Sequence, residues 1–473
     1  MKLTRNLFGI VALSLCLGFA SCSDDDDPLN NDPLNNEPHN NEPQYSQAQV
    51  TNSELKTILE QNGLHFDDQG HLLLDEAANN LKALDLSGKK ISDYKELSVL
   101  PNLVELNLSN NEFGPTFDFG ILPAQITAVD LRGNDIYEYE NLVNIETAEN
   151  GDEKITLVRD LTKFYLPETA KNNCNEIVAY YNTDKDVDMK LEDAPYTTLR
   201  EVPDAAIREI LKTSFPSLFD KKETDKINLN NRLIDATEAQ AALFLAADSW
   251  GSPLEGVTSL EGVQYVTMNK GYNGTMFIAS FAEADKVEMP YIVLNPNMAQ
   301  MVMMNVSTPK MDFSKATNLC TAQITNNEGL ETLDLSNCKL LGQRGIDAEL
   351  DIMNNPSSLR FVNCNSLKKI IFPKNAKNLE ALELSNTKAL EELDLSRFEY
   401  IASLIIAGEL KCNITYLDYK WGKYPTAKFG TSEKIFAKPE TLAFCKKYND
   451  QLKQVLPSSA SGLPMFIWKN HIK

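Results

Sequence analysis

Apolar and polar positions recur in a fixed order early in the chain. The three segments that share this order are 81–88, 103–111 and 126–134. Each fits all or most of the pattern L-x-x-L-x-L-x-x-N, and the central residues Leu84, Leu106 and Val129 lie 22 and 23 residues apart. Self-similarity at this period predicts one short strand per repeat, with the Leu positions pointing inward and the Asn position tying the turn beneath. The repeats should therefore stack their strands into an extended sheet.

A second set of segments with the same apolar frame lies further along the chain. These segments are 289–297, 319–327, 330–338, 367–375, 379–387, 390–398 and 401–408. Here the central residues Leu382, Leu393 and Leu404 lie 11 residues apart, which is half of a repeat. Strands should therefore occur twice in each turn of this part of the chain.

The two sets together resemble the BspA-like leucine-rich repeat proteins of Bacteroidetes. In that family, coils of about 22 residues carry extended segments on both sides. The resemblance implies an α/β fold, a leucine-rich repeat solenoid in two modules, whose short strands stack into extended sheets. It implies little about function, because one fold serves many functions.

A helical segment precedes each set of repeats. In residues 51–63, Thr51 and Glu54 have the spacing of a capping box, and in residues 202–220 Asp204 is the expected cap. The apolar faces of the two helices are Leu55, Ile58 and Leu59 in the first and Ile207, Ile210 and Leu211 in the second. Because a helix can cover the open end of a stack of repeats, two such helices indicate two modules.

These features divide the chain into six parts. They are a lipoprotein signal peptide (1–21), a lipidated cysteine with an acidic tag and a Pro/Asn-rich stalk (22–46), a first cap with repeats (47–183), a linker (184–199), a second cap with repeats (200–410) and a basic capping segment (411–473). A further helix is expected over residues 235–248.

The first residues have the composition of an export signal. Two basic residues precede an apolar run over residues 7–20, which has the length of a signal-peptide core and is too short to span a bilayer. The run ends in the letters FASC, which resemble the lipobox of bacterial lipoproteins, so that Cys22 would become the acylated N-terminus. The acidic run 24–27 resembles the tag that exports Bacteroidetes lipoproteins to the cell surface. An ordinary secretory cleavage and an acidic start to a linker are the alternatives.

Net charge excludes some partners. The chain has 45 Lys and Arg against 67 Asp and Glu, which gives a formal charge of −22 and argues against nucleic acid and against an anionic membrane surface. Residues 411–473 differ, with eleven lysines against four acids. We interpret this segment as a closing cap with a solvated basic face, and contact with an anionic polymer, lipid head groups or the acidic body is the alternative.

The sequence contains no catalytic or cofactor motif in a suitable context, whether GxSxG, HExxH, a P-loop or a dinucleotide fingerprint. In the loop 65–72 only Asp67 fits the frame of a calcium-binding turn, so we expect a turn without metal, with a transition-metal site at His65 and His71 as the alternative. No CxxC pair occurs, and Cys338 and Cys364 fit buried repeat positions. We therefore expect no enzyme, no cofactor and no metal, a hydrolase using paired acids being the alternative.

One polar residue in each repeat lies between the last two apolar positions and should point outward. These residues are Asp85, Asn107 and Asp130 in the first module and Asp334, Glu383 and Asp394 in the second. Stacked coils would align such positions into an acidic stripe, suited to basic protein surfaces or hydroxyl-rich sugars. A solvated repeat surface is the alternative. The half-coil spacing should place Glu383 and Asp394 on opposite sides.

Methionines cluster in residues 298–305. Met298, Met301 and Met303 fall on the apolar frame and should fill the core, a binding patch being the alternative. Val302 and Met304 should point outward.

These observations predict a lipid-anchored protein of the outer membrane, exposed on the cell surface, that recognises protein or glycan without catalysis. Adhesion or host interaction would be its role, and its membrane attachment would be the lipid alone. The alternative is a structural or accessory outer-membrane lipoprotein that docks to a nutrient-uptake or envelope complex. We expect a monomer.

Overall fold

The computed structural model describes most of residues 43–407. The gaps are 149–152, 184–185, 249–250, 284–286, 309, 344–356, 396 and 399, and beyond residue 407 the described strands are 413–415, 419–421, 427–429 and 468–470. The predicted signal peptide, Cys22, the stalk up to residue 42 and most of the basic segment lie outside the described residues. The described residues from Tyr45 onward belong to one compact unit.

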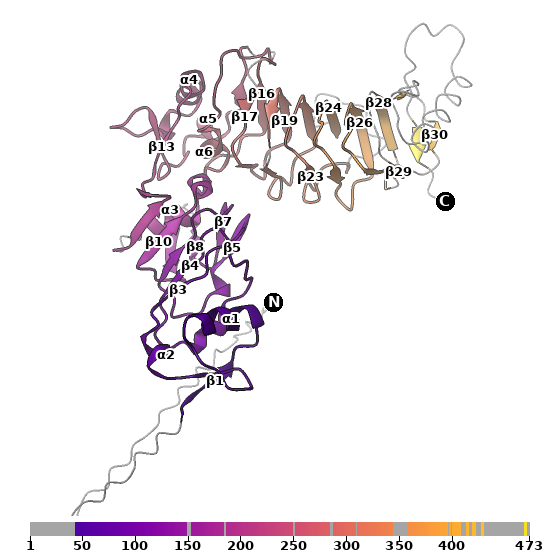
Figure 1. Ribbon diagram of the computed structural model, residues 1–473. Helices are drawn as coiled ribbons and strands as arrows, with labels where there is room; N and C mark the ends of the chain where they lie inside the picture. Colours follow the sequence, from indigo (N-terminus) through magenta and orange to yellow (C-terminus); the bar gives the residue numbers. More distant parts are fainter. Residues whose placement is uncertain are drawn as a thin grey trace, which may run out of the picture. The chain divides into compact units, whose positions relative to one another are not determined.

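A six-stranded sheet runs through the first module, residues 45–195 (Figure 1). Its strands are β3 (Ala83–Asp85), β4 (Glu105–Asn107), β6 (Ala128–Asp130), β10 (Lys163–Leu166), β11 (Asp188–Leu191) and β12 (Ala194–Pro195). Neighbours are parallel except β11 and β12, and the register aligns Leu84, Leu106, Val129 and Phe164 in one row. All four side chains are buried, so the predicted inward positions form the core of this module.

Shorter elements connect these strands. They are β1 (Tyr45–Gln49), α1 (Ser53–Gln61), β2 (His71–Leu73), α2 (Glu76–Asn80), η1 (Lys95–Val99), β5 (Thr116–Asp118), η2 (Phe119–Ile121), β7 (Glu138–Glu140), β8 (Val143–Thr147), β9 (Glu153–Leu157), η3 (Glu168–Asn172) and α3 (Glu176–Tyr181). Strands β5 and β7 pair in parallel, and β8 and β9 form an antiparallel hairpin.

Helix α1 buries the predicted face of Leu55, Ile58 and Leu59, but the predicted cap was wrong. Asn52 is the N-cap, and its Oδ1 accepts hydrogen bonds from the backbone N–H groups of Glu54 and Leu55, at 3.0 Å each. Thr51 instead donates from its backbone and hydroxyl to the Glu96 carboxylate. A charged acceptor from a distant segment thus engages Thr51 and leaves the capping position to its neighbour.

The second module, residues 199–407, begins with the antiparallel pair β13 (Leu199–Glu201) and β14 (Lys226–Asn228), which flanks α4 (Ala205–Ser214) and η4 (Pro216–Leu218). Asp204 caps α4 as predicted, because its Oδ1 accepts from the backbone N–H groups of Ala206 and Ile207 at 2.9 and 3.1 Å. The face of Ile207 and Leu211 is buried, and Ile210 packs beside it.

A ten-stranded sheet forms the body of the second module (Figure 1). Its strands are β15 (Leu243–Leu245), β16 (Met276–Ser280), β19 (Gln300–Met304), β22 (Thr321–Thr325), β24 (Ser358–Val362), β26 (Asn378–Ser385), β28 (Tyr400–Ala407), β30 (Tyr419–Trp421), β31 (Ala427–Phe429) and β32 (Trp468–Asn470). From β15 to β28 every pair is parallel and in register.

The helix predicted over 235–248 was wrong in most of its length. Helix α5 covers only Ala236–Ala239, and β15 follows it. Leu243 and Leu245 are fully buried while Phe244 between them is half-buried. That period of two is the pattern of a strand. Pairing with β16 outweighs the helix propensity of the neighbouring alanines.

Parallel strand pairs outside the large sheet accompany it. They are β17 (Val287–Glu288) with β20 (Val306–Ser307), β18 (Ile292–Val293) with β21 (Met311–Asp312), β23 (Thr332–Asp334) with β25 (Lys369–Ile371), and β27 (Glu392–Asp394) with β29 (Asn413–Thr415). A last helix, α6 (Val263–Thr267), precedes β16. Leu382 and Leu404 belong to the large sheet and Leu393 to β27, so the 11-residue spacing reflects strands that alternate between two sheets.

Asparagine side chains tie successive turns together. In the first module Asn111 and Asn134, which occupy the Asn position of the sequence pattern, are buried and donate to backbone carbonyls of the preceding turn at 2.9 and 3.0 Å. In the second module the Nδ2 of Asn326, Asn363 and Asn386 each donates to the Oδ1 of the asparagine before it, at 2.6 to 2.8 Å. The predicted role of the Asn position is confirmed in the first module.

The fold is thus α/β, with many short strands in parallel and antiparallel sheets and few helices. One hydrophobic core extends from Val50 to Tyr196, and a second from Val202 to Phe398 also includes Cys174. Within the described part of the chain, none of the helices has the length and apolar character needed to cross a membrane.

Candidate functional site

The six outward residues predicted to bind lie in four different sheets. They are Asp85 in β3, Asn107 in β4, Asp130 in β6, Asp334 in β23, Glu383 in β26 and Asp394 in β27. Only the first three are register neighbours. Glu383 and Asp394 belong to separate sheets, as their spacing indicated, so the second-module residues form no common row.

Four of these side chains hold the turn that follows their strand. The Oδ1 atoms of Asp85, Asn107, Asp130 and Asp334 accept a hydrogen bond from the backbone N–H two residues further on, at 2.9 to 3.1 Å. For Asp85 this bond from Ser87 is the main cause that lowers the pKa of the carboxyl. The residues therefore have a structural role, and ligand binding by them stays a prediction.

The outward row of the first module is not a purely acidic stripe. Beyond Asp130 the register continues to Tyr165 and Lys190. Asp130 is only 6% exposed, and its carboxylate accepts from the guanidinium of Arg132 at 2.6 to 3.2 Å. The ring centroid of Tyr165 lies 4.6 Å from the ammonium groups of Lys163 and Lys190. Of the two acids in this row, Asp130 is therefore paired with a basic neighbour.

The outward row of the ten-stranded sheet begins with apolar side chains. Phe244, Ile278 and Val302 are register partners on β15, β16 and β19. Each is half-buried, while Met301 and Met303 beside Val302 are fully buried, as predicted. The outward side of this sheet therefore carries a continuous apolar strip, which we call the apolar row.

Polar residues continue the apolar row along the sheet. The register passes from Val302 to Gln323, Arg360 and Glu383. The Nε of Arg360 lies 2.7 Å from a carboxylate oxygen of Glu383. Met304 also points outward, as predicted, at half-buried exposure. Sequence inspection missed Phe244 and Ile278, although the alternation in 243–245 and 276–280 carried the signal.

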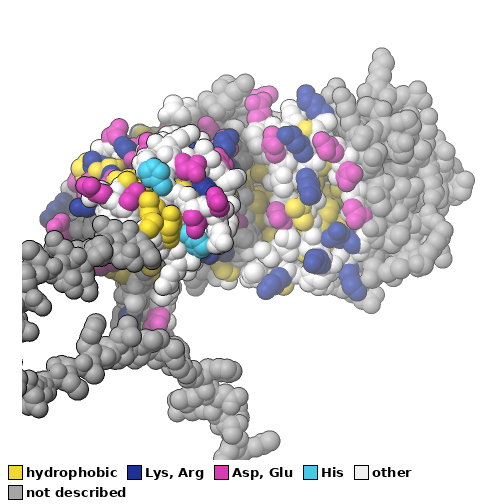
Figure 2. Space-filling model, turned by 60° about the horizontal axis from the view of Figure 1, so that its bottom comes forward, with side chains coloured by type: hydrophobic (Ala, Val, Ile, Leu, Met, Phe, Trp, Pro, Cys, Tyr) yellow, Lys and Arg dark blue, Asp and Glu magenta, His cyan; other side chains and the backbone are white. Residues whose placement is uncertain are grey.

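The histidine loop of residues 65–72 is held by its own side chains. Asp67 accepts from the backbone N–H groups of Gln69 and His71 at 2.9 and 2.8 Å, and its second oxygen lies 2.8 Å from the His71 ring. His65 lies 3.3 Å from Asp75 instead. Both described histidines appear on one face in Figure 2, beside a small hydrophobic group and among interspersed acidic and basic side chains. Among described residues there is no group of three or more His, Cys, Asp and Glu side chains that would hold a metal.

Cys174, Cys338 and Cys364 are free thiols with buried side chains. Cys338 and Cys364 occupy core positions, as predicted. Burial raises the pKa of the Cys174, Cys338 and Cys364 thiols to about 12. These thiols stay protonated at neutral pH, which disfavours them as nucleophiles.

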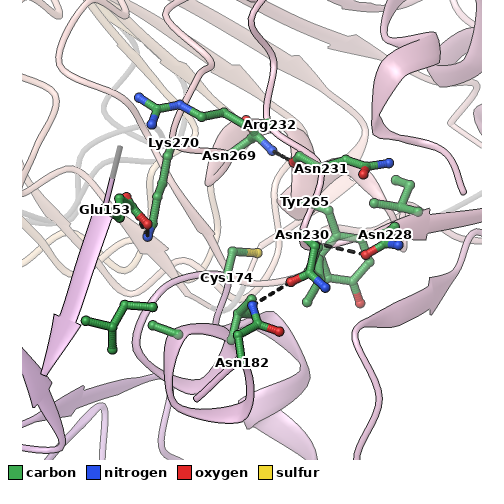
Figure 3. Close-up of a pocket in the computed structure, with 15 residues that line it drawn as sticks. Glu153, Cys174, Asn182, Asn228, Asn230, Asn231, Arg232, Tyr265, Asn269 and Lys270 are labelled. Carbon is green, nitrogen blue, oxygen red and sulfur yellow. Dashed lines mark hydrogen bonds and ion pairs between the residues drawn. The ribbon is translucent and has the colours of Figure 1, made fainter. Parts of the chain in front are cut away.

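A cavity of about 280 Å³ lies where elements of both modules meet; we call it the junction cavity (Figure 3). Its lining comes from the β8–β9 hairpin, helix α3, the segment after β14 and the end of α6. The labelled side chains are Glu153, Cys174, Asn182, Asn228, Asn230, Asn231, Arg232, Tyr265, Asn269 and Lys270. Since these residues are far apart in the sequence, no local motif could reveal the cavity.

Lys270 and Glu153 join the two modules at this cavity, with Nζ to Oε distances of 2.8 and 2.9 Å. Asn182 donates to Oδ1 of Asn230 at 2.7 Å, which is a second link. Figure 3 shows the Cys174 sulfur among these polar groups.

No known protein family, curated protein or solved structure matches the chain.

Proposed function

We propose that the chain is a lipid-anchored cell-surface protein whose two-module leucine-rich repeat solenoid recognises another protein without catalysis. Three features support the repeat assignment. Parallel strands stack in register, asparagines tie successive turns, and central apolar residues 11 apart alternate between two sheets. The anchor is supported by the sequence around Cys22, which resembles a lipobox. Two or more acyl chains would hold the protein stably on a membrane.

The apolar row carries the proposal for protein recognition. Phe244, Ile278 and Val302 lie side by side on the outward face, and the ion pair of Arg360 and Glu383 follows on the same sheet. An apolar patch with charged groups beside it is a feature of protein interfaces. The partner is therefore a protein that presents an apolar strip with charged groups at one end.

Binding to a panel of mucin, extracellular-matrix proteins and proteins of the organism's own envelope tests this proposal. The full-length protein is immobilised, and Val302→Asp is compared with Thr332→Asp, which adds the same charge at an exposed position on β23. We expect Val302→Asp to weaken capture at least about tenfold, because a buried interface charge costs more than 1.4 kcal/mol. Equal binding by both variants, or binding to nothing in the panel, would contradict the proposal.

Protease treatment of intact cells tests the location. Release of the body by protease, together with loss of membrane attachment in Cys22→Ala, is the expected result. A body that stays protected would instead support an accessory lipoprotein within the envelope.

A further inference from the structure

We propose that the junction cavity binds one neutral sugar unit. The cavity of about 280 Å³ lies just below the roughly 300–1,000 Å³ typical of ligand pockets, so it has room for one small ligand at most. This site is separate from the apolar row, and its ligand is of a different chemical class from the protein partner proposed above.

The floor of the cavity is apolar. Val178, Ile227 and Tyr265 line it and are between 1% and 6% exposed. Cys174 adds a protonated thiol, which behaves as a small apolar group. Such a floor offers contact to the C–H face of a sugar ring without requiring further hydrogen bonds.

The lining includes amides whose orientation is fixed by hydrogen bonds within the protein. Asn228 donates to Asp220 at 3.0 Å, and Asn231 donates to the backbone carbonyls of Leu218 and Phe219 at 3.3 and 3.1 Å. Asn269 donates to the carbonyl of Asn231 at 2.8 Å. The side chains are therefore held in place before any ligand arrives, which lowers the entropy cost of binding.

These amides retain capacity for hydroxyl groups. Within the described residues, the Oδ1 atoms of Asn182 and Asn231 accept no hydrogen bond, and the Nδ2 of Asn182 uses one of its two protons on Asn230. An amide presents donors and acceptors side by side, and a hydroxyl both donates and accepts. Adjacent hydroxyls on one ring match this arrangement better than a purely acceptor ligand such as phosphate.

The charged groups favour a neutral ligand. Lys270 and Glu153 neutralise each other at 2.8 Å, with side chains 28% and 23% exposed. The pair still offers a charged donor and a charged acceptor for hydroxyls, and such bonds are stronger than neutral ones. Because Glu153 belongs to the first module and Lys270 to the second, one sugar would contact both modules.

Titration calorimetry of the full-length protein with free glucose, galactose, mannose and N-acetylglucosamine tests this proposal, with glucuronic acid and inorganic phosphate as charged probes. We expect one neutral sugar to bind with a stoichiometry of one. Asn182→Leu, at an exposed position, and Lys270→Met should each weaken it about tenfold, the loss expected for one hydrogen bond of about 1.4 kcal/mol. Asn297→Leu is the matched control, because Asn297 is an exposed asparagine that does not line the cavity.

Three results would overturn the proposal: no neutral sugar binds, the charged probes bind instead, or both cavity variants bind the sugar as tightly as the control. Circular dichroism of each variant guards against loss of fold. The sheet variant Val302→Asp should bind the sugar normally, so that failure of one proposal is distinguishable from failure of the other.

Discussion

Asn134 offers the sharpest test of how the first module is held together. The residue is 6% exposed, and its side chain makes five hydrogen bonds with the backbone, four of them at 2.8 to 3.1 Å. Nδ2 donates to the carbonyls of Leu108 and Leu131 at 3.0 and 2.8 Å, and Oδ1 accepts from the N–H groups of Asn111 and Phe113 at 2.8 and 3.1 Å. At about 1 kcal/mol per bond, Asn134→Ala should lower the free energy of unfolding by about 3 to 4 kcal/mol, because the four backbone groups lose their partner.

The matched control is Asn107→Ala. Asn107 makes one such bond, to the N–H of Ser109 at 3.1 Å, and is half-buried, so the cost should be about 0.5 to 1 kcal/mol. Urea denaturation, followed by hydrogen exchange of residues 103–136, measures both changes within the first module. If Asn134→Ala lowers the free energy of unfolding no more than Asn107→Ala does, the asparagine side chain does not hold successive turns together.

Two further predictions concern the buried acid Asp204 and the buried thiol of Cys174. Burial opposes ionisation of Asp204, but bonds from Thr258, Ile207 and Ala206 outweigh it and lower its pKa. Its stabilising effect should therefore be complete above the unfolded pKa of about 3.9 and be lost as pH falls through the lower folded value. Acid denaturation should show a shallower pH dependence in Asp204→Asn, and an unchanged slope would refute this. Cys174 should resist iodoacetamide at neutral pH until urea unfolds the chain, because burial raises its thiol pKa to about 12; peptide mass spectrometry measures this, and rapid labelling of the native protein would contradict it.

The inward residues were predictable from sequence because the period alone determines which side chains face the core. Leu84, Leu106 and Val129 recur at the spacing of one turn, and each pairs in register with the next. Met301 and Met303 followed the same rule although neither is leucine. Because side chains alternate between the two faces of a strand, the regularly spaced apolar positions all lie on the same, buried face.

Contacts between distant segments were not predictable. Thr51 has the spacing of a capping residue, but its hydroxyl donates a hydrogen bond to Glu96 from another turn. Phe244 lies in an alanine-rich stretch with high helix propensity, and only pairing with β16 makes that stretch a strand. The junction cavity depends on residues as far apart as Glu153 and Lys270. Each case depends on a partner that local sequence does not contain.

The repeat pattern is therefore a poor guide to where a ligand is recognised. The outward side chains of Asp85, Asn107 and Asp334 each accept a hydrogen bond from the turn that follows their own strand. Substitution of such a side chain to suit a ligand would also alter the stability of its turn. Phe244, Ile278 and Val302 lie at outward positions of the same kind but have no polar atom to hold a turn. Partner selection is therefore expected where strands depart from the repeat pattern.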